Sequence, residues 1–327
     1  MTSVTVSAVV TAHNRRGFLA EAVRSALDSG ADEVIVVRNF DGPIEGCEGR
    51  YRDLRCDIAD TGEKEARGLE VATGDVVAYL DDDDVWEATK VPRIRERFGS
   101  DGRLVYFCHA QRAIDRSGQF VHATHREIEG KDPTQFASAD RDDLRFLVER
   151  VWTGNNSSTV IRRSWALGWV PTLREAGWAC DLFWFVAALL GDGGIELSPE
   201  PLVRLRLHDQ NMSQTRGASS PDEFRRRHAA SSTRFARAYD VMSRAVVARR
   251  GTGSPFGRFL DQGATAFHFF ADLETGTRPR AAAWKAIWHG PGLRQRGVLG
   301  TAFVALLSPA EARRLLFRAS LRRWELR

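Results

Sequence analysis

The sequence lacks long apolar runs, and its few cysteines are not arranged as a metal site or a disulfide framework. No hydrophobic stretch reaches the ~18 residues that a membrane-spanning helix needs. The four cysteines lie far apart without CxxC spacing, which predicts reduced thiols in a cytoplasmic protein and no structural zinc. Polar residues interrupt the first apolar run and no basic lead precedes it, so we expect a strand there and not a signal peptide.

Charge is present but unevenly placed. Residues 222–327 hold 20 Lys and Arg against 8 Asp and Glu, a net charge of +12, whereas residues 1–221 carry −8. Beyond Pro221 the pattern is helical, with breaks at 251–255, 276–279 and 290–292. We therefore expect an acidic globular part followed by a basic helical region with a different role.

The first 110 residues alternate between strand-like and helix-like segments. Apolar runs typical of buried strands occupy residues 5–10, 33–37, 75–80 and 104–108. Helical spacing occupies residues 18–27, 63–73 and 87–98. Repeated βαβ units predict an α/β fold with a mostly parallel sheet and helices on both faces. The next hundred residues predict a hairpin at 115–118, a helix at 181–190, and strands at 158–161 and 202–207.

Polar residues end three of the predicted strands. They form the segments Thr11–Asn14, Arg38–Asn39 and Asp81–Asp84. Because ligands bind beyond the carboxyl ends of the strands in such sheets, we expect all three segments on one rim.

The segment Asp81–Asp84 is unusual because like charges in contact repel, so that one or more of the carboxyls would hold a proton. A divalent cation resolves this repulsion, since Mg²⁺ and Mn²⁺ prefer oxygen ligands and commonly bind one or two carboxylates together with substrate phosphates. The alternative is a solvated turn or a helix start with additional acidic residues.

Two segments resemble the family 2 glycosyltransferases of the GT-A fold, and the resemblance covers roughly residues 4–212. They are VSAVVTAHNRRGFLAEAVRSAL near the start and GEKEARGLEVATGDVVAYLDDDDVWEATKV. The resemblance implies a Rossmann-like mixed sheet, mostly parallel, with an α-helical C-terminal extension. It divides the chain into a nucleotide-sugar-binding half (1–106), an acceptor-binding half (107–215) and a basic helical region (216–327).

The resemblance also implies the donor site. Asp81 and Asp83 fall on the family's DxD positions: Asp83 would ligate Mg²⁺ or Mn²⁺, and Asp81 would bind ribose or the metal. The other residues implied at the nucleotide sugar are Thr11, Asn14, Arg15, Arg67 and Asp82. For Arg67 a salt-bridged, solvent-facing helix residue is the alternative. The chain departs from the family where an aspartate pair usually follows the second strand; it has Asn39 and Asp41, which can still contact a base. Gly68 also stands where asparagine is usual.

On the acceptor side the resemblance points to Asp181 as the catalytic base, with Cys180 in place of the family's first acid. Direct displacement by an acceptor hydroxyl deprotonated at Asp181 would invert the anomeric configuration. The plain alternative is a helix N-cap. His208 falls where members hold the metal or phosphates, although a surface histidine is equally compatible. The resemblance also implies an acceptor-binding segment with Trp152, Asn155 and Asn156. The alternative for Trp152 is a residue of the hydrophobic core.

In the basic helical region, the apolar segment 298–307 could form an amphipathic helix that lies on an anionic membrane, because aromatic residues are interleaved with arginines around it. We expect peripheral contact with the cytoplasmic face of a membrane and a glycan or lipid-linked acceptor, while packing on the catalytic domain stays open. No zinc-finger or RNA-recognition signature is present, so no nucleic-acid partner is expected. The alternatives to a glycosyltransferase are a non-catalytic sugar-nucleotide-binding module and a nucleotidyltransferase, although no P-loop is present.

Overall fold

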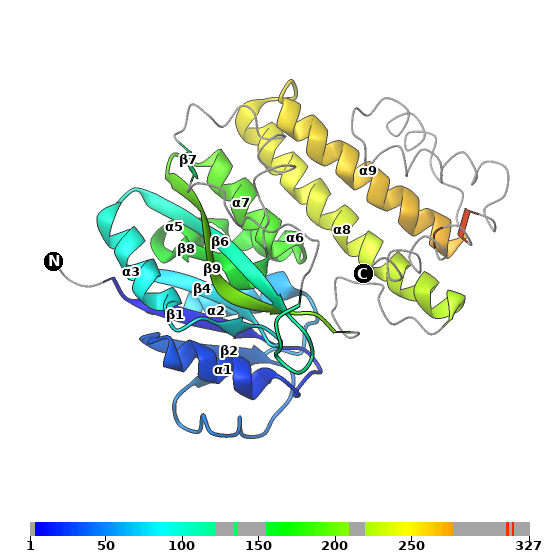
Figure 1. Cartoon of the computed structure of the whole chain (residues 1–327). Coiled ribbons are helices and arrows are strands. Elements are labelled where there is room, and N and C mark those ends of the chain that lie inside the picture. Colours follow the sequence, from blue (N-terminus) through cyan, green and yellow to red (C-terminus); the bar gives the residue numbers. More distant parts are fainter. Residues whose placement is uncertain are drawn as a thin grey trace. The chain divides into compact units, whose positions relative to one another are not determined.

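The computed structural model describes residues 4–121, 134–136, 155–208 and 220–276, together with residues 312, 313 and 316. The chain divides into two compact units, residues 1–207 and 208–327, which are described separately. The first unit is a sheet covered by helices, and the second is helical (Figure 1). The predicted α/β fold with a helical C-terminal extension is confirmed.

Parallel strands form one half of the sheet, in the order β3-β2-β1-β4. β1 (Val6–Thr11), β2 (Glu33–Arg38) and β4 (Val76–Asp81) are apolar and buried along most of their length. β3 (Arg52–Arg55) lies at the edge and is polar. Runs that are apolar at nearly every position fit strands that are covered on both faces.

The other half of the sheet contains antiparallel pairs. β8 (Thr159–Arg162) lies antiparallel between β4 and β6 (Leu104–Ile114). β9 (Gly194–Arg206) runs parallel to β6 and also pairs with the short β5 (Val85–Trp86) and β7 (Thr134–Phe136). The sheet is therefore mixed, and the chain that leaves β4 enters β5 beside β9.

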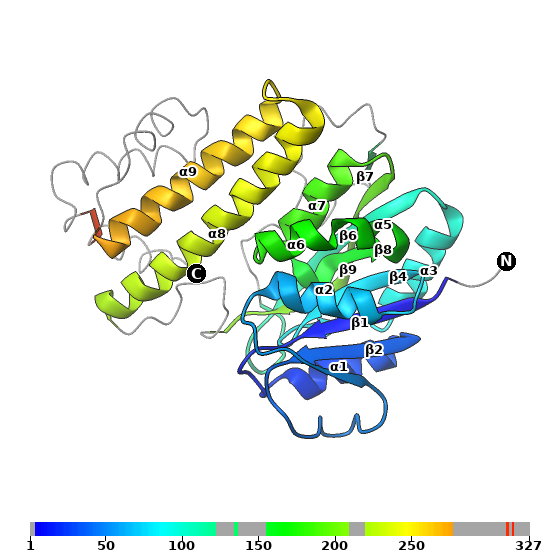
Figure 2. The ribbon, with the colours of Figure 1, turned by 180° about the vertical axis from the view of Figure 1, so that it is seen from behind.

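Helices cover both faces of the sheet. α1 (Leu19–Asp28) and α3 (Lys90–Ser100) lie on one face. α2 (Thr61–Val71), α6 (Val170–Ala176) and α7 (Cys180–Leu190) cover the other face, which is nearer the viewer when the molecule is turned round (Figure 2).

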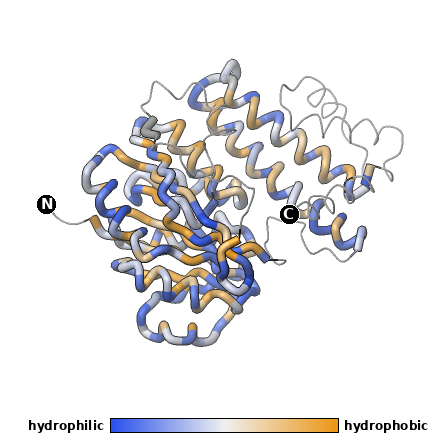
Figure 3. The backbone as a smooth tube through the Cα atoms, viewed as in Figure 1, coloured by the Kyte–Doolittle hydropathy of each residue, from blue (hydrophilic) through white to orange (hydrophobic). Residues whose placement is uncertain are grey.

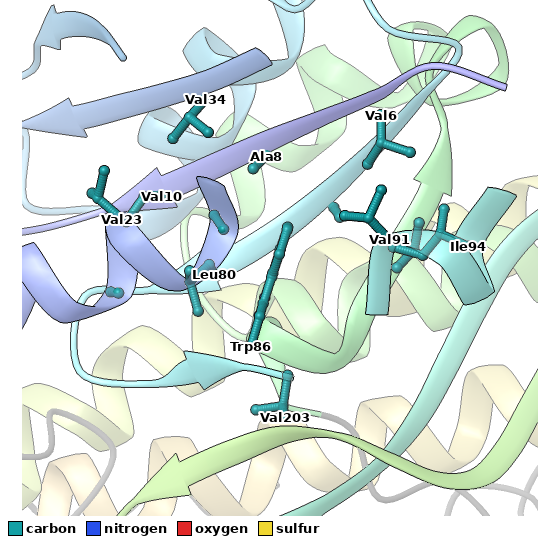
Figure 4. Packing of buried hydrophobic residues seen from close by; sticks show 14 of the residues in the cluster. Val6, Ala8, Val10, Val23, Val34, Leu80, Trp86, Val91, Ile94 and Val203 are labelled. Carbon is teal, nitrogen blue, oxygen red and sulfur yellow. The ribbon is translucent and has the colours of Figure 1, made fainter. Parts of the chain in front are cut away.

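One hydrophobic cluster of the first unit lies between the sheet and helices α1 and α3. Val6, Ala8 and Val10 of β1 point toward these helices, and Trp86 and Val203 extend the same cluster (Figure 4). Apolar residues are accordingly concentrated along the central strands (Figure 3). Burial of this continuous apolar surface is the main stabilising contribution to the unit.

The second unit is built around two long helices that pack side by side, α8 (Pro221–Arg250) and α9 (Pro255–Thr275). Ser220 and Ser254 cap their amino ends, each accepting a backbone N–H of the first turn. Gly251 and Gly276, both with positive φ, end the helices. The predicted breaks at 251–255 and at Gly276 are confirmed, and the break at 290–292 lies outside the described residues. None of the helices in the described ranges is both long and apolar enough to cross a membrane.

Candidate active site

The carboxyl ends of β1, β2 and β4 meet at one edge of the sheet. Thr11, the last residue of β1, is the register partner of both Val37 in β2 and Asp81 in β4. The predicted convergence of these strand ends on one rim is confirmed, and this is the edge at which parallel α/β sheets bind ligands.

Two asparagines join the turns that follow β1 and β2. The backbone N–H of Asn14 donates to Asn39 Oδ1 at 2.9 Å, and Asn39 Nδ2 donates to Asn14 Oδ1 at 2.7 Å. Asn14 adopts a left-handed conformation, with φ of 59°, which asparagine tolerates better than most residues. The pair fixes the positions of two predicted donor-site residues relative to each other.

The four aspartates of the acidic run have different surroundings. Asp81 ends β4 and is partly exposed, whereas Asp82, Asp83 and Asp84 are buried. Asp84 is held from two sides, because Ser157 Oγ donates to its Oδ2 at 2.6 Å and the Arg206 backbone N–H donates to its Oδ1 at 2.9 Å. Asp84 therefore serves to anchor the turn.

The short 3₁₀ helix η3 (Asn156–Ser158) packs against the acidic run. Asn156 Nδ2 donates to Asp81 Oδ1 at 3.1 Å, and the backbone N–H of Asp81 donates to Ser157 Oγ. Asn155 Nδ2 lies 3.5 Å from Asp84 Oδ2. Both asparagines predicted at the acceptor thus contact the carboxylates, and their acceptor role stays a prediction. Trp152 lies outside the described residues.

Arg15 supplies a positive charge to the acidic run. Its Nε and Nη2 donate hydrogen bonds to the two carboxylate oxygens of Asp82, and its Nη1 donates to Asp83 Oδ2 at 2.7 Å. Burial opposes the charge of Arg15, but the two aspartates hold its pKa above the usual value. Like-charge repulsion in the run is therefore offset within the protein, so the repulsion by itself does not demand a metal ion.

Burial raises the pKa of three of these carboxyls, those of Asp81, Asp82 and Asp84. Burial first, then the charge of Asp83, raise the pKa of Asp81 to about 7. Burial raises the pKa of Asp82 to about 8, against the opposing effect of Arg15. A second cation beside these groups would favour their ionised form.

The chemistry of the donor atoms fits Mg²⁺ or Mn²⁺ if a substrate completes the coordination. Asp81 and Asp83 offer carboxylate oxygens from one turn, which is the ligand type these ions prefer. Among the residues that the structure describes, no three His, Cys, Asp or Glu side chains gather as metal ligands. The remaining oxygens would have to come from a diphosphate or water.

Asp181 is a carboxylate separate from the run, in the first turn of α7. It is partly exposed, and its Oδ1 accepts the backbone N–H of Leu182 at 2.8 Å. Ala179, just before α7, has a left-handed conformation with φ of 53°, which is uncommon for a residue with a side chain. Besides burial and Asp83, the charge of Asp181 adds to the raised pKa of Asp81, so the two carboxylates lie within electrostatic range.

A comparison with known protein families identifies the family of the residues that form this rim. The family model described as glycosyl transferase family 2 matches residues 7–166, which include β4, the acidic run, η3 and all of β1 except Val6. Residues 7–166 belong to glycosyl transferase family 2. Among curated proteins, no sequence matches the chain.

Solved structures share the fold of this chain. Staphylococcus aureus TarS, residues 1–349, aligns with a TM-score of 0.52 and 11% identity, with 92% of each chain covered. The same values hold for TarS crystallised with UDP-GlcNAc, with UDP, and with neither. At this identity the likeness shows the fold and not the substrate.

Three other predicted residues lie in different settings. Arg67 pairs with Glu63 at 2.8 Å and donates to the Arg55 carbonyl, so its contacts are those of the salt-bridged alternative. Asp41 is exposed and pairs with Arg55 at 3.0 Å. His208 follows β9, is buried, and begins the second unit. Their donor and metal roles stay predictions.

Sequence reasoning missed Glu65, which is fully buried in the glycosyltransferase domain. Trp184 Nε1 of α7 donates to Glu65 Oε2 at 2.8 Å, so this bond joins α2 to the helix that carries Asp181. Burial raises the pKa of Glu65 to about 8. A signal was present, because helical spacing places Glu65 on one face with Leu69 and Ala72, both apolar.

Arg206 was also missed, although it is buried among the residues that shape the acidic run. Its Nε donates to the Asp83 carbonyl at 2.9 Å and its Nη2 to Glu21 Oε2 at 2.6 Å, while its cation lies over the Phe18 ring. In the segment LVRLRL, Arg206 looks like any solvent-facing arginine of a strand with alternating polarity. Its partners Asp83 and Glu21 lie far away in the sequence, so the segment alone does not predict its burial.

Proposed function

We propose that the chain is an inverting glycosyltransferase that moves a sugar from a nucleoside-diphosphate sugar to a hydroxyl of a glycan or lipid-linked acceptor. The observation that carries the proposal is the acidic run at the converging strand ends, within electrostatic range of the separate carboxylate Asp181. Two carboxylate sites with different surroundings suit two tasks, binding of a charged leaving group and removal of a proton.

The donor would lie on the rim formed by β1, β2 and β4. Thr11 and the Asn14–Asn39 pair face this edge, and Asp41 and Arg67 belong to neighbouring segments. TarS has been crystallised with UDP-GlcNAc and with UDP, which supports a nucleotide-sugar donor for the shared fold. Arg15 and Asp82 would lie beside the diphosphate.

Mg²⁺ or Mn²⁺ would be held by Asp83 and Asp81, and the donor's diphosphate and water would supply the remaining oxygens. When bound, such an ion neutralises negative charge that develops on the diphosphate leaving group. The protein's own contribution is to hold the carboxylates in place, which Asn156 does for Asp81 and Arg206 does for the Asp83 backbone.

Asp181 would act as general base toward the acceptor hydroxyl. Its side chain is partly exposed and one of its oxygens already accepts a backbone N–H, which fixes its orientation. The attacking oxygen would approach opposite the leaving diphosphate, so the anomeric configuration inverts. Trp152, Asn155 and Asn156 would line the acceptor side.

The first experiment is a thermal-shift screen of nucleotide sugars with and without Mn²⁺. One donor should raise the melting temperature, and only when metal is present. The shift should be measurable, because a ligand at 100 times its Kd stabilises the native state by about 2.7 kcal/mol. Product analysis should then show a nucleoside diphosphate and an inverted anomeric centre. No shift with any donor would contradict the proposal, and release of pyrophosphate from a nucleoside triphosphate would indicate a nucleotidyltransferase.

The Asp181→Asn variant tests the base. We expect turnover to fall by about 10²- to 10⁴-fold, because the amide cannot accept the proton, while donor binding measured by thermal shift is retained. Asp192→Asn, at a carboxylate beyond the end of α7, is the matched control and should keep wild-type turnover. Unchanged turnover in Asp181→Asn would remove the base assignment.

A further inference from the structure

Arg15 bonds to the same carboxylate that is proposed to bind the divalent cation. Asp83 Oδ2 accepts a hydrogen bond from Nη1 of Arg15 at 2.7 Å, and the Asp82 carboxylate accepts hydrogen bonds from Nε and Nη2. The Arg15 side chain is only 20% exposed, and the carboxylates of Asp82 and Asp83 are less exposed still. A cation that binds Asp83 therefore has to share this oxygen with the guanidinium or displace it.

We propose that Arg15 is the counter-cation of the acidic run before the donor binds, and that it transfers from Asp83 to the donor's diphosphate when the divalent cation enters. This inference rests on the proposed function and adds a rule for how the site fills. Arg15 thereby makes metal binding depend on the presence of the donor.

The chemistry of the guanidinium supports this exchange. Arginine stays protonated, so Arg15 cannot lose its charge when a metal ion approaches. A divalent cation bound alone would separate a largely buried ion pair and leave two positive groups side by side. A diphosphate removes that conflict, because its oxygens accept a guanidinium fork as well as carboxylates do.

The turn that carries Arg15 is suited to hold the backbone while the side chain moves. Asn14 is tied to Asn39 by two hydrogen bonds, and Ala12 N–H donates to the Val37 carbonyl at 3.0 Å. We therefore expect the guanidinium to exchange between carboxylate and phosphate by rotation of side-chain torsions, with the backbone of the turn held in place.

The neighbouring Arg16 offers a matched control with the same charge. Its Nη1 donates to the Asp41 carbonyl at 2.7 Å and its cation lies 4.5 Å from the centre of the Phe40 ring. Arg16→Gln changes the net charge of the protein as much as Arg15→Gln does but leaves the ion pairs of the acidic run intact.

The test is isothermal titration of the full chain with Mn²⁺, alone and with saturating UDP or GDP, corrected for Mn²⁺ that the nucleotide binds in solution. In the wild-type protein, nucleotide should tighten Mn²⁺ binding on the order of tenfold or more, within the usual range of coupling between sites. In Arg15→Gln, Mn²⁺ alone should bind on the order of tenfold tighter than in wild type, and the gain from nucleotide should shrink. Arg16→Gln should match wild type.

Equal Mn²⁺ affinity of wild type and Arg15→Gln, with native circular dichroism spectra, would overturn the Arg15 proposal. Arg15→Lys keeps the charge but loses the fork, and it should give an intermediate affinity; it decides the matter if Arg15→Gln does not fold. Failure of every nucleotide to bind the wild type would instead contradict the proposed function, and the titrations with Mn²⁺ alone would still decide whether Arg15 competes for the site.

Discussion

At the scale of single residues, the buried carboxyl of Glu65 should make the stability of the protein depend on pH. It has no exposed surface, and it accepts one hydrogen bond from Trp184 of α7. Burial raises its pKa from 4.5 to about 8, so it carries a proton in the folded protein at neutral pH. In the unfolded chain the same group is ionised there, which makes stability depend on pH.

We predict that this dependence has a definite sign. The folded state holds one more proton than the unfolded state between pH 4.5 and about 8, so the free energy of unfolding falls as pH rises through that window. For one group the slope approaches about 1.4 kcal/mol per pH unit. Glu65→Gln, which keeps an acceptor for Trp184, should flatten the slope in urea unfolding measured at several pH values.

Glu70→Gln is the matched control on the same helix. Glu70 is exposed and pairs with Arg174 at 2.7 Å, so its substitution should preserve the wild-type slope. An unchanged slope in Glu65→Gln would show that Glu65 ionises freely in the folded state.

Part of the candidate site could be predicted from residue types alone. The acidic run after an apolar strand, together with the polar residues at the ends of β1 and β2, predicts the ligand-binding rim of the sheet. The partners that make the four aspartates unequal could not be predicted, because Ser157 and Arg206 lie more than 70 positions away and meet the run only through the sheet order. The family resemblance implies Arg15 at the nucleotide, whereas its ion pairs with Asp82 and Asp83 cannot be predicted from the sequence.

At the scale of elements, periodicity predicted the buried strands and helices well and their ends less well. The helix expected at 87–98 begins at Lys90, because Val85 and Trp86 pair with β9 as a short strand. The strand expected at 104–108 continues to Ile114, and the one expected at 202–207 already begins at Gly194. In both cases the pairing between β6 and β9 extends the strand through residues of mixed polarity.

The departure from the family at Gly68 has a packing explanation, which yields a prediction. A Cβ at Gly68 of α2 would lie 2.4 Å from Val9 Cγ1 of β1, so α2 can approach the sheet only without a side chain there. Gly68→Ala should lower the free energy of unfolding by about 1–3 kcal/mol, measured by urea titration. Adding Val9→Ala should recover part of the loss by removing the clashing methyl groups.

Gly99 in α3 provides the comparison for this substitution. A Cβ there would have its nearest neighbour, Val4 Cγ2, at 3.8 Å, which is ordinary contact. Gly99→Ala should therefore be neutral or stabilise by up to about 1 kcal/mol through helix propensity. Equal effects of the two substitutions would refute the packing explanation.

At the scale of the whole molecule, the chain joins an acidic α/β unit to a basic helical unit. Within the described part of the second unit some arginines already have partners: Arg227 pairs with Glu223, and Arg313 donates to the Leu273 carbonyl at 2.8 Å. The segment 298–307, in which membrane contact was predicted, lies outside the described residues. Contact with an anionic membrane therefore stays a proposal, supported by the net charge of residues 222–327.

We predict that the full chain sediments with vesicles that contain anionic lipids at low ionic strength. Each Lys or Arg near such a surface contributes about 1 kcal/mol, and salt screens the attraction as the Debye length shortens from about 10 Å at 0.1 M to about 3 Å at 1 M. Binding should therefore decrease with salt and be weak on uncharged phosphatidylcholine vesicles. Absence of binding to anionic vesicles at low salt would leave packing within the protein as the role of the basic residues.

The unequal surroundings of the four aspartates also have a genetic consequence. A run of identical residues looks tolerant of a gained or lost codon, yet each member is fixed: Asp81 by its register with Thr11, Asp82 and Asp83 by Arg15, and Asp84 by Ser157. An insertion or deletion of one aspartate would shift every later member onto the wrong partner. Length variation within the run should therefore be eliminated by selection, even though the altered sequence would still read as an acidic motif.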